Sequence, residues 1–166
     1  MTLAISKTSL IYVCICDLLV ALFIIAMPIL AHLFPIPLYI LEPMRLAVFA
    51  TLILMPNRKM NAIMMALLLP LLSYIISGHP IAVKNILIAI ELVANVTLFQ
   101  LLVSKFNHVG FSMFASILTS KLFYYGMKYV CLSIGLLSIN IISTPLIIQI
   151  IVSIVISLVF AIWYKK

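Results

Sequence analysis

The apolar residues of this chain fall into long runs that short proline-, glycine- or charge-containing breaks separate. A helix that crosses a bilayer needs about 20 mostly apolar residues. Six runs fit this pattern, although the second and third are short. The expected spans are approximately 10–33, 38–55, 62–76, 86–103, 111–132 and 145–164. The pattern therefore predicts an all-α membrane protein in which residues 1–166 form a single domain, one bundle of six transmembrane helices.

The breaks predict where the chain turns. "HLFPIPLYILEP" contains three prolines and is expected to form a loop at the bilayer edge, with Pro43 as a kink if the second helix begins near Leu38. "MPNRKMN" and the stretch around Ser77-Gly78-His79-Pro80 predict tight turns between helices. The first run carries Asp17 and lacks a cleavage site of small residues, so it is expected to be a retained span rather than a signal peptide.

The basic residues predict the orientation of the bundle, because cytoplasmic loops carry an excess of lysine and arginine. With a cytoplasmic N-terminus, only Arg45 and Lys84 lie outside. The basic residues that then lie inside are Lys7, Arg58, Lys59, Lys105, Lys165 and Lys166. Both termini are therefore predicted to be cytoplasmic in a multi-pass protein of the cell membrane, and the turn at His79 is predicted to face outward.

Composition supports a lipid environment and excludes several classes of function. Hydrophobic residues make up 67% of the chain, charged residues 8%, and the mean hydropathy is +1.40. These values are typical of membrane proteins. The net charge of +7 does not indicate nucleic-acid binding, because the basic residues lie mostly between apolar runs. The cysteines all lie in apolar segments, where small buried hydrophobic residues are expected rather than disulfides or metal ligands: Cys14, Cys16 and Cys131.

No catalytic or nucleotide-binding motif occurs, so the chain is not expected to be an enzyme or to hold a cofactor. His32, His79 and His108 are far apart in the sequence, and His108 is predicted on the opposite side of the membrane from the other two, so no metal site is expected. Uphill transport by this chain would need energy from another subunit or an ion gradient.

Polar residues inside the spans mark the candidate site. A charge at membrane depth costs about 2.5–3.5 kcal/mol on insertion scales and usually faces the bundle interior. Glu91 and Asn95 share one face of the fourth span, and the stripe in the fifth span is spaced at i, i+4 and i+7. The candidate ligand-binding residues are Glu91, Asn95, Lys121, Tyr124, Tyr125, Lys128, Gln149 and, in the external turn, His79.

Two interpretations of this set remain open. In the first, the residues line an outward cavity in which lysines bind an anionic group and Tyr124 or Tyr125 stacks on a ring. In the second, Glu91 forms an ion pair with Lys121 or Lys128 that only fixes helix packing.

The remaining polar residues also have alternatives without a ligand. Asn95 and Gln149 can act as interhelical hydrogen bonds, Lys128 can snorkel to the interface, and His79 can simply be solvated. Glu42 and Arg45 can pair with each other. Asp17 can pair with Arg58 or Lys59, or face a partner protein.

Several stretches resemble the substrate-binding membrane subunit, or S component, of energy-coupling factor (ECF) transporters. They are "EPMRLAVFATLIL", "ALLLPLLSYIISGHP", "ILIAIELVANVTLFQLLVSK", "SILTSKLFYYGMKYV" and "STPLIIQIIVSIVI", and together they cover roughly residues 38–166. The family's Ala-x-x-x-Ala motif is not met in the first span, where Ala21 and Ala26 are five apart. Ser120-Lys121 stands where many members carry Gly-Arg.

The resemblance implies a six-helix bundle that binds a micronutrient, a vitamin or its precursor, near its outer face. It also implies that the loop between helices three and four helps to gate the site. The implied partners are a coupling transmembrane subunit and two cytoplasmic ATPase subunits, and the bundle would topple to release its ligand inside. The alternative function is a structural or assembly membrane protein that has no small-molecule ligand.

Overall fold

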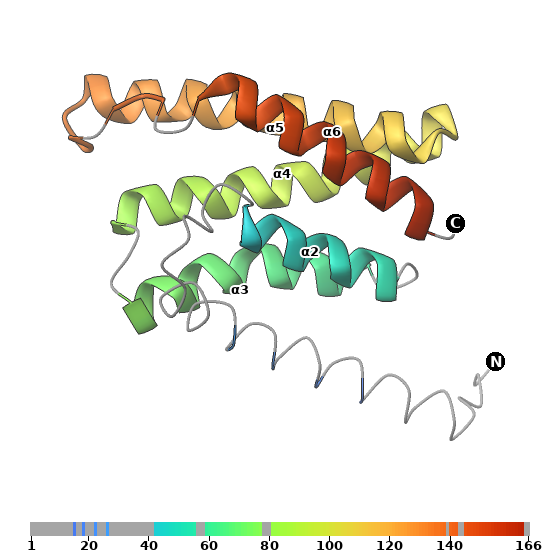
Figure 1. Cartoon of the computed structure of the whole chain (residues 1–166). Helices are drawn as coiled ribbons and strands as arrows, with labels where there is room; N and C mark the ends of the chain where they lie inside the picture. The colour runs from blue at the N-terminus through green and yellow to red at the C-terminus, as the bar shows by residue number, and fades with distance from the viewer. Residues whose placement is uncertain are drawn as a thin grey trace.

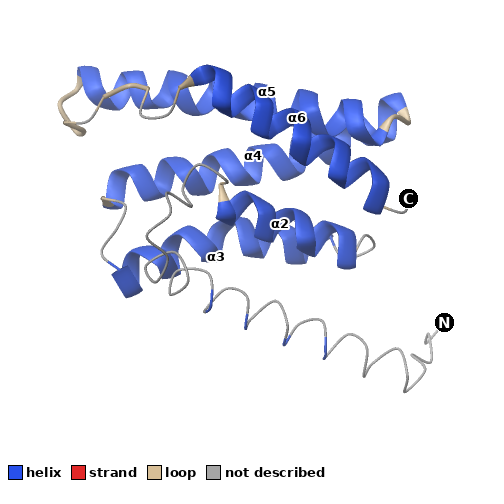
Figure 2. Cartoon of the chain, viewed as in Figure 1, coloured by secondary structure: helices blue, strands red, loops and turns tan. Residues whose placement is uncertain are grey.

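The computed structural model describes Ile15, Leu18, Leu22 and Ala26, and then residues 42–55, 59–77, 81–138, 140–142 and 145–164. Beyond the four single residues, this part of the chain forms five helices and contains no strand (Figure 2). The helices are α2 (Pro43–Leu54), α3 (Lys59–Ser77), α4 (Ala82–Phe106), α5 (Val109–Ser133) and α6 (Leu146–Trp163). The prediction of an all-α chain is confirmed for these residues.

The five helices form a closed ring around an apolar core. Each helix packs against the next one along the chain, and α6 packs back against α2 (Figure 1). Consecutive helices run antiparallel, so α2, α4 and α6 begin at the same end of the bundle (Figure 1). Phe99 and Phe160 pack edge to face in the core with ring centroids 5.1 Å apart. The ring therefore brings α2 next to helices that lie far from it in the sequence.

Proline, glycine and asparagine set several of the helix ends. Pro43 occupies the first position of α2, where a missing backbone N–H does no harm, so it begins the helix and the predicted kink is wrong. Asn107 has φ 57° and ends α4 two residues before α5 begins. Gly135 has φ +78° just after α5, and Leu136 N–H donates to Cys131 O at 2.9 Å. This is the left-handed residue with which many helices end.

Within the described residues, three helices are long and apolar enough to cross a membrane: Lys59–Ile76, Ala82–Phe106 and Leu146–Trp163. They indicate that the protein associates with a membrane. α2 is apolar but only 12 residues long. α5 has the 25 residues of α4 but carries lysines and several serines, and it is not among the three. Isoleucines of α6, among them Ile147 and Ile162, are exposed on the outside of the ring, as expected of a surface that faces lipid.

Gly110 marks a close approach of α5 to α6. A Cβ atom placed there would lie 3.2 Å from Ala161 Cβ and 3.7 Å from Ser157 O, whereas one at Gly126 would meet nothing within 4 Å. Overpacking a tight contact typically costs about 1–3 kcal/mol. Gly110→Leu should therefore lower the thermal unfolding midpoint in detergent micelles, and Gly126→Leu in the same helix should leave it near the wild-type value. Equal midpoints for the two variants would contradict this packing.

Candidate functional site

Four charged residues form one connected network, here called the charge cluster: Glu42 and Arg45 at the start of α2, Glu91 of α4 and Lys121 of α5. The Arg45 guanidinium pairs with both Glu91 and Glu42, and the Lys121 ammonium pairs with Glu42. The cluster contains two cations and two carboxylates, so its formal charge is balanced. Such a network can persist at membrane depth because each charge has a partner of opposite sign.

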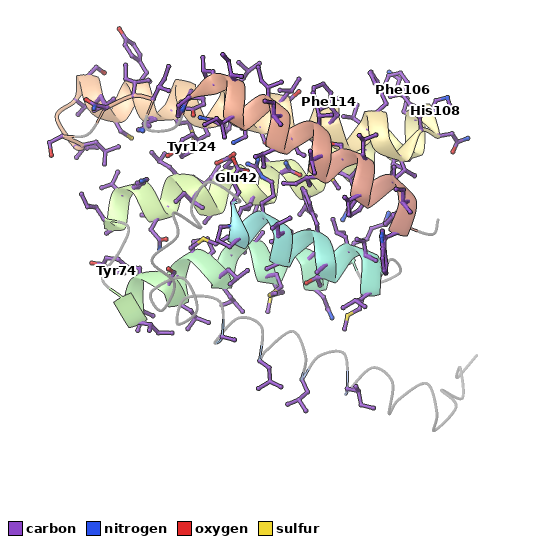
Figure 3. All side chains as sticks on the ribbon, in the orientation of Figure 1. Glu42, Tyr74, Phe106, His108, Phe114 and Tyr124 are labelled. Carbon is purple, nitrogen blue, oxygen red and sulfur yellow. The ribbon has the colours of Figure 1, made fainter. Side chains whose placement is uncertain are left out.

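The start of α2 determines how Arg45 and Glu42 are placed. Arg45 lies in the first turn of the helix, three residues after Glu42. Its backbone N–H donates to the backbone carbonyl oxygen of Glu42 at 2.9 Å. Glu42 has φ 50°, a left-handed conformation that costs an ordinary residue about 1–2 kcal/mol. The two ion pairs of its carboxylate help to hold this backbone in place. Figure 3 shows Glu42 at the start of α2.

Burial varies across the charge cluster. The Arg45 side chain is 3% exposed and that of Glu91 is 10% exposed, whereas the side chains of Lys121 and Glu42 are 13% and 20% exposed. Arg45 and Glu91 therefore form the inner part of the cluster. Lys121 and Glu42 form the outer part, which is the part that a small molecule could reach first.

Gln149 extends the cluster onto α6. Its Nε2 donates to the Tyr125 hydroxyl at 2.7 Å, and its Oε1 accepts from Lys121 Nζ at 3.3 Å. Lys121 and Tyr125 lie one helical turn apart on α5, which is why a single glutamine can contact both. The structure thus brings together four of the predicted residues: Glu91, Lys121, Tyr125 and Gln149.

Asn95 and Tyr124 lie beside this group but make different contacts. Asn95 is fully buried, and its Nδ2 donates to Ser120 Oγ at 3.2 Å. It therefore joins α4 to α5 one turn further along from Glu91, in agreement with the interpretation of Asn95 as an interhelical hydrogen bond. Tyr124 packs edge to face on Tyr125 with ring centroids 5.4 Å apart, and it is labelled in Figure 3.

Lys128 does not join the charge cluster. Its side chain is fully buried, so the prediction that it snorkels to the interface is wrong. Its Nζ donates to Ile141 O at 2.7 Å and lies 5.9 Å from the centroid of the Tyr124 ring. The suggested ion pair of Glu91 with Lys121 or Lys128 is also wrong, because Glu91 pairs with Arg45.

Arg45 and Glu42 are the members of the cluster that sequence reasoning did not include in the site. The expectation that Glu42 and Arg45 can pair with each other is confirmed. The link from Arg45 to Glu91 spans 46 residues and has no local signal in the sequence. His79 and Asp17 lie outside the described residues, as do Cys14 and Cys16. Within the described ranges, no group of three His, Cys, Asp or Glu side chains is placed to hold a metal ion.

The chain matches no protein-family model, no curated protein and no solved structure. The inference of function therefore depends on the sequence pattern and on the geometry of the side chains. That geometry gives a cluster with both charge signs, an amide and a phenol, within reach of one another. Such a set can bind a small molecule that carries both donors and acceptors.

Proposed function

We propose that the chain is the substrate-binding membrane subunit of an ECF-type transporter that takes up a micronutrient, a vitamin or its precursor. In this proposal the protein spans the cell membrane six times, both termini are cytoplasmic, and the ligand binds near the outer face. A coupling transmembrane subunit and two cytoplasmic ATPase subunits supply the energy. The ligand site consists of the outer part of the charge cluster with Tyr125 and Gln149.

The convergence of charged and polar groups on one partly accessible place carries this proposal. α2, α4, α5 and α6 each contribute a residue to it, although every charge placed in an apolar bundle is costly. If the cluster only served packing, it could be as deeply buried throughout as Arg45 is. Lys121 and Glu42 are instead partly exposed, which is where a ligand would enter.

Ligand binding would proceed by exchange of partners. A hydrogen-bond acceptor of the ligand can replace Gln149 Oε1 as a partner of the Lys121 ammonium. The distance from Lys121 Nζ to Gln149 Oε1 is 3.3 Å, which is long for a hydrogen bond to a cation. A ligand donor can then use the Glu42 carboxylate, while the Gln149 oxygen still accepts from the Tyr125 hydroxyl at 2.9 Å. Arg45 remains paired with Glu91 throughout, so this inner pair stays neutral while Lys121 and Glu42 exchange their partners for the ligand.

The mutual pairing of the four charges favours a second candidate function, that of a structural or assembly protein without a ligand. Buried ion pairs often fix the arrangement of helices rather than bind anything. The two functions differ in what the outer residues do. If the cluster is structural, neutral variants of Lys121 will change stability and will leave small-molecule uptake by the cell unaltered.

The proposed topology predicts which loops face outward. In a variant with Cys14, Cys16 and Cys131 replaced by alanine, Ser138→Cys between α5 and α6 should react with a membrane-impermeant maleimide added to intact cells. His108→Cys between α4 and α5 should react only after the cells are permeabilised. Both side chains are exposed, so access alone does not separate them. The reverse labelling pattern would contradict the predicted orientation.

Purification from native membranes in mild detergent tests the assignment to the ECF class. The full chain should co-purify with a second, larger membrane protein and with ATPase subunits that carry a P-loop. A tagged, unrelated multi-pass protein from the same membranes is the control for nonspecific association. Recovery of the chain alone, or with no ATPase above that control, would contradict the assignment.

A further inference from the structure

Lys128 is a fully buried cation that has no carboxylate partner among the described residues. Its Nζ is bonded to one backbone carbonyl, that of Ile141, and lies beside the face of the Tyr124 ring. An ammonium group has three N–H donors. Both described carboxylates, Glu42 and Glu91, pair with Arg45 or Lys121 instead. A buried charge without a counter-ion is costly, so the position of Lys128 calls for an explanation beyond packing.

A second lysine, Lys84 of α4, lies toward the same end of the α4–α5 pair as Lys128. The contact between Asn95 and Ser120 fixes the register of α4 against α5. From that contact Lys84 is about 16 Å and Lys128 about 12 Å toward the same end of the helix pair, at about 1.5 Å per residue. This end therefore concentrates positive charge.

The first turn of α4 adds to the same imbalance. The helix has no side-chain cap at its N-terminus, where Ile81 is the capping residue. The free N–H groups there carry a partial positive charge. This partial charge has the same sign as the Lys84 ammonium, which lies in the same turn.

We propose that this end of the α4–α5 pair binds an anionic group, a carboxylate or a phosphate, between Lys84 and Lys128 with the Tyr124 ring beside it. The inference rests on the proposed function, since the anion would be part of the transported ligand. It assigns the anionic group to Lys84 and Lys128 rather than to Lys121, which Glu42 already neutralises. Tyr124 contacts Tyr125, so the anion site lies next to the outer part of the charge cluster.

The test uses the full chain in neutral detergent micelles, with inorganic phosphate and succinate as probes at constant ionic strength. Each probe should raise the thermal unfolding midpoint of the wild type in a saturable way. Lys128→Met and Lys84→Gln should each weaken binding and so raise the half-saturating concentration of each probe at least tenfold. Lys105→Gln, a change of an exposed lysine at the other end of α4, should behave like the wild type.

The unfolding midpoint without any anion separates binding from a purely structural role of Lys128. Removing an uncompensated buried charge should leave the midpoint of Lys128→Met equal to that of the wild type or higher. If Lys128 serves only to anchor the chain at Ile141, the variant will instead be less stable and will respond to both probes as the wild type does. That result would overturn the proposal.

Lipid headgroups carry the same phosphate chemistry, so a second arm identifies the source. The wild type is compared in phosphatidylcholine and phosphatidylglycerol nanodiscs, with and without added phosphate. Stabilisation by free phosphate in phosphatidylcholine supports a soluble ligand. Stabilisation by phosphatidylglycerol alone, lost in Lys128→Met, supports an anion site that a lipid fills and contradicts the link to transport. No stabilisation by any anion overturns the site itself, whether or not the cell still takes up the micronutrient.

Discussion

Glu91→Gln should lower the free energy of unfolding by about 3–5 kcal/mol, the range typical for removing one partner of a buried ion pair. The reason is that Arg45 remains in the core with a side chain only 3% exposed. Among the described residues, Glu42 would then be the one carboxylate left for both Arg45 and Lys121, so the four-residue cluster would carry a net positive charge. Chemical or thermal unfolding in detergent micelles, followed by circular dichroism, measures the loss.

The double variant Arg45→Met with Glu91→Leu is the control for this result. It removes both members of the inner pair and leaves Glu42 and Lys121 balanced, so it should be much more stable than Glu91→Gln alone. Replacing a whole buried pair by apolar residues is often neutral or stabilising. A double variant as unstable as the single one, or a single variant as stable as the wild type, would contradict the cluster described above.

Lys121→Gln should weaken ligand binding at least tenfold, which corresponds to a loss of about 1.4 kcal/mol. A hydrogen bond to a charged group typically contributes about 1.5–3 kcal/mol, so losing the ammonium is sufficient for this effect. The loss of stability should be smaller than for Glu91→Gln, because Lys121 is partly exposed and Glu42 keeps its pair with Arg45. The rate of uptake by cells that depend on the micronutrient measures the change in binding.

Lys105→Gln provides the matched control, since it removes the same charge from an exposed position of α4. Its uptake should equal that of the wild type at the same amount of protein in the membrane. If Lys121→Gln and Lys105→Gln had the same uptake, Lys121 would not contact the ligand, and the packing role of the cluster would be favoured.

Periodicity along the sequence predicted much of the helical framework, because long apolar runs and their breaks are local signals. The predicted gap between the spans 86–103 and 111–132 contains the end of α4 at Phe106 and the start of α5 at Val109. The break before α2 was harder to interpret, because Pro43 is compatible with both a kink and a helix start. The left-handed backbone at Glu42 makes Pro43 the start.

The candidate site was predicted in part. Lys121 and Tyr125 share a helix face, so their common contact with Gln149 follows the expected geometry. The pairing of Glu91 with Arg45 depends on which helices become neighbours when α6 packs against α2 and closes the ring, and no local pattern carries that information. The spacing of Lys128 placed it in one stripe with Lys121 and Tyr125, whereas its Nζ donates to Ile141 O in the segment that follows α5.

The measurement that tests the central proposal most directly is mass spectrometry of small molecules released from the full chain after purification from its native membranes. The proposal predicts one recurring small molecule, close to one per protein, that carries a carboxylate or phosphate group. It should be retained by Lys105→Gln and strongly reduced in Lys121→Gln. Repeated preparations that carry no such molecule, or equal amounts in Lys121→Gln and the wild type, would contradict the proposal that this protein binds a transport substrate at the charge cluster.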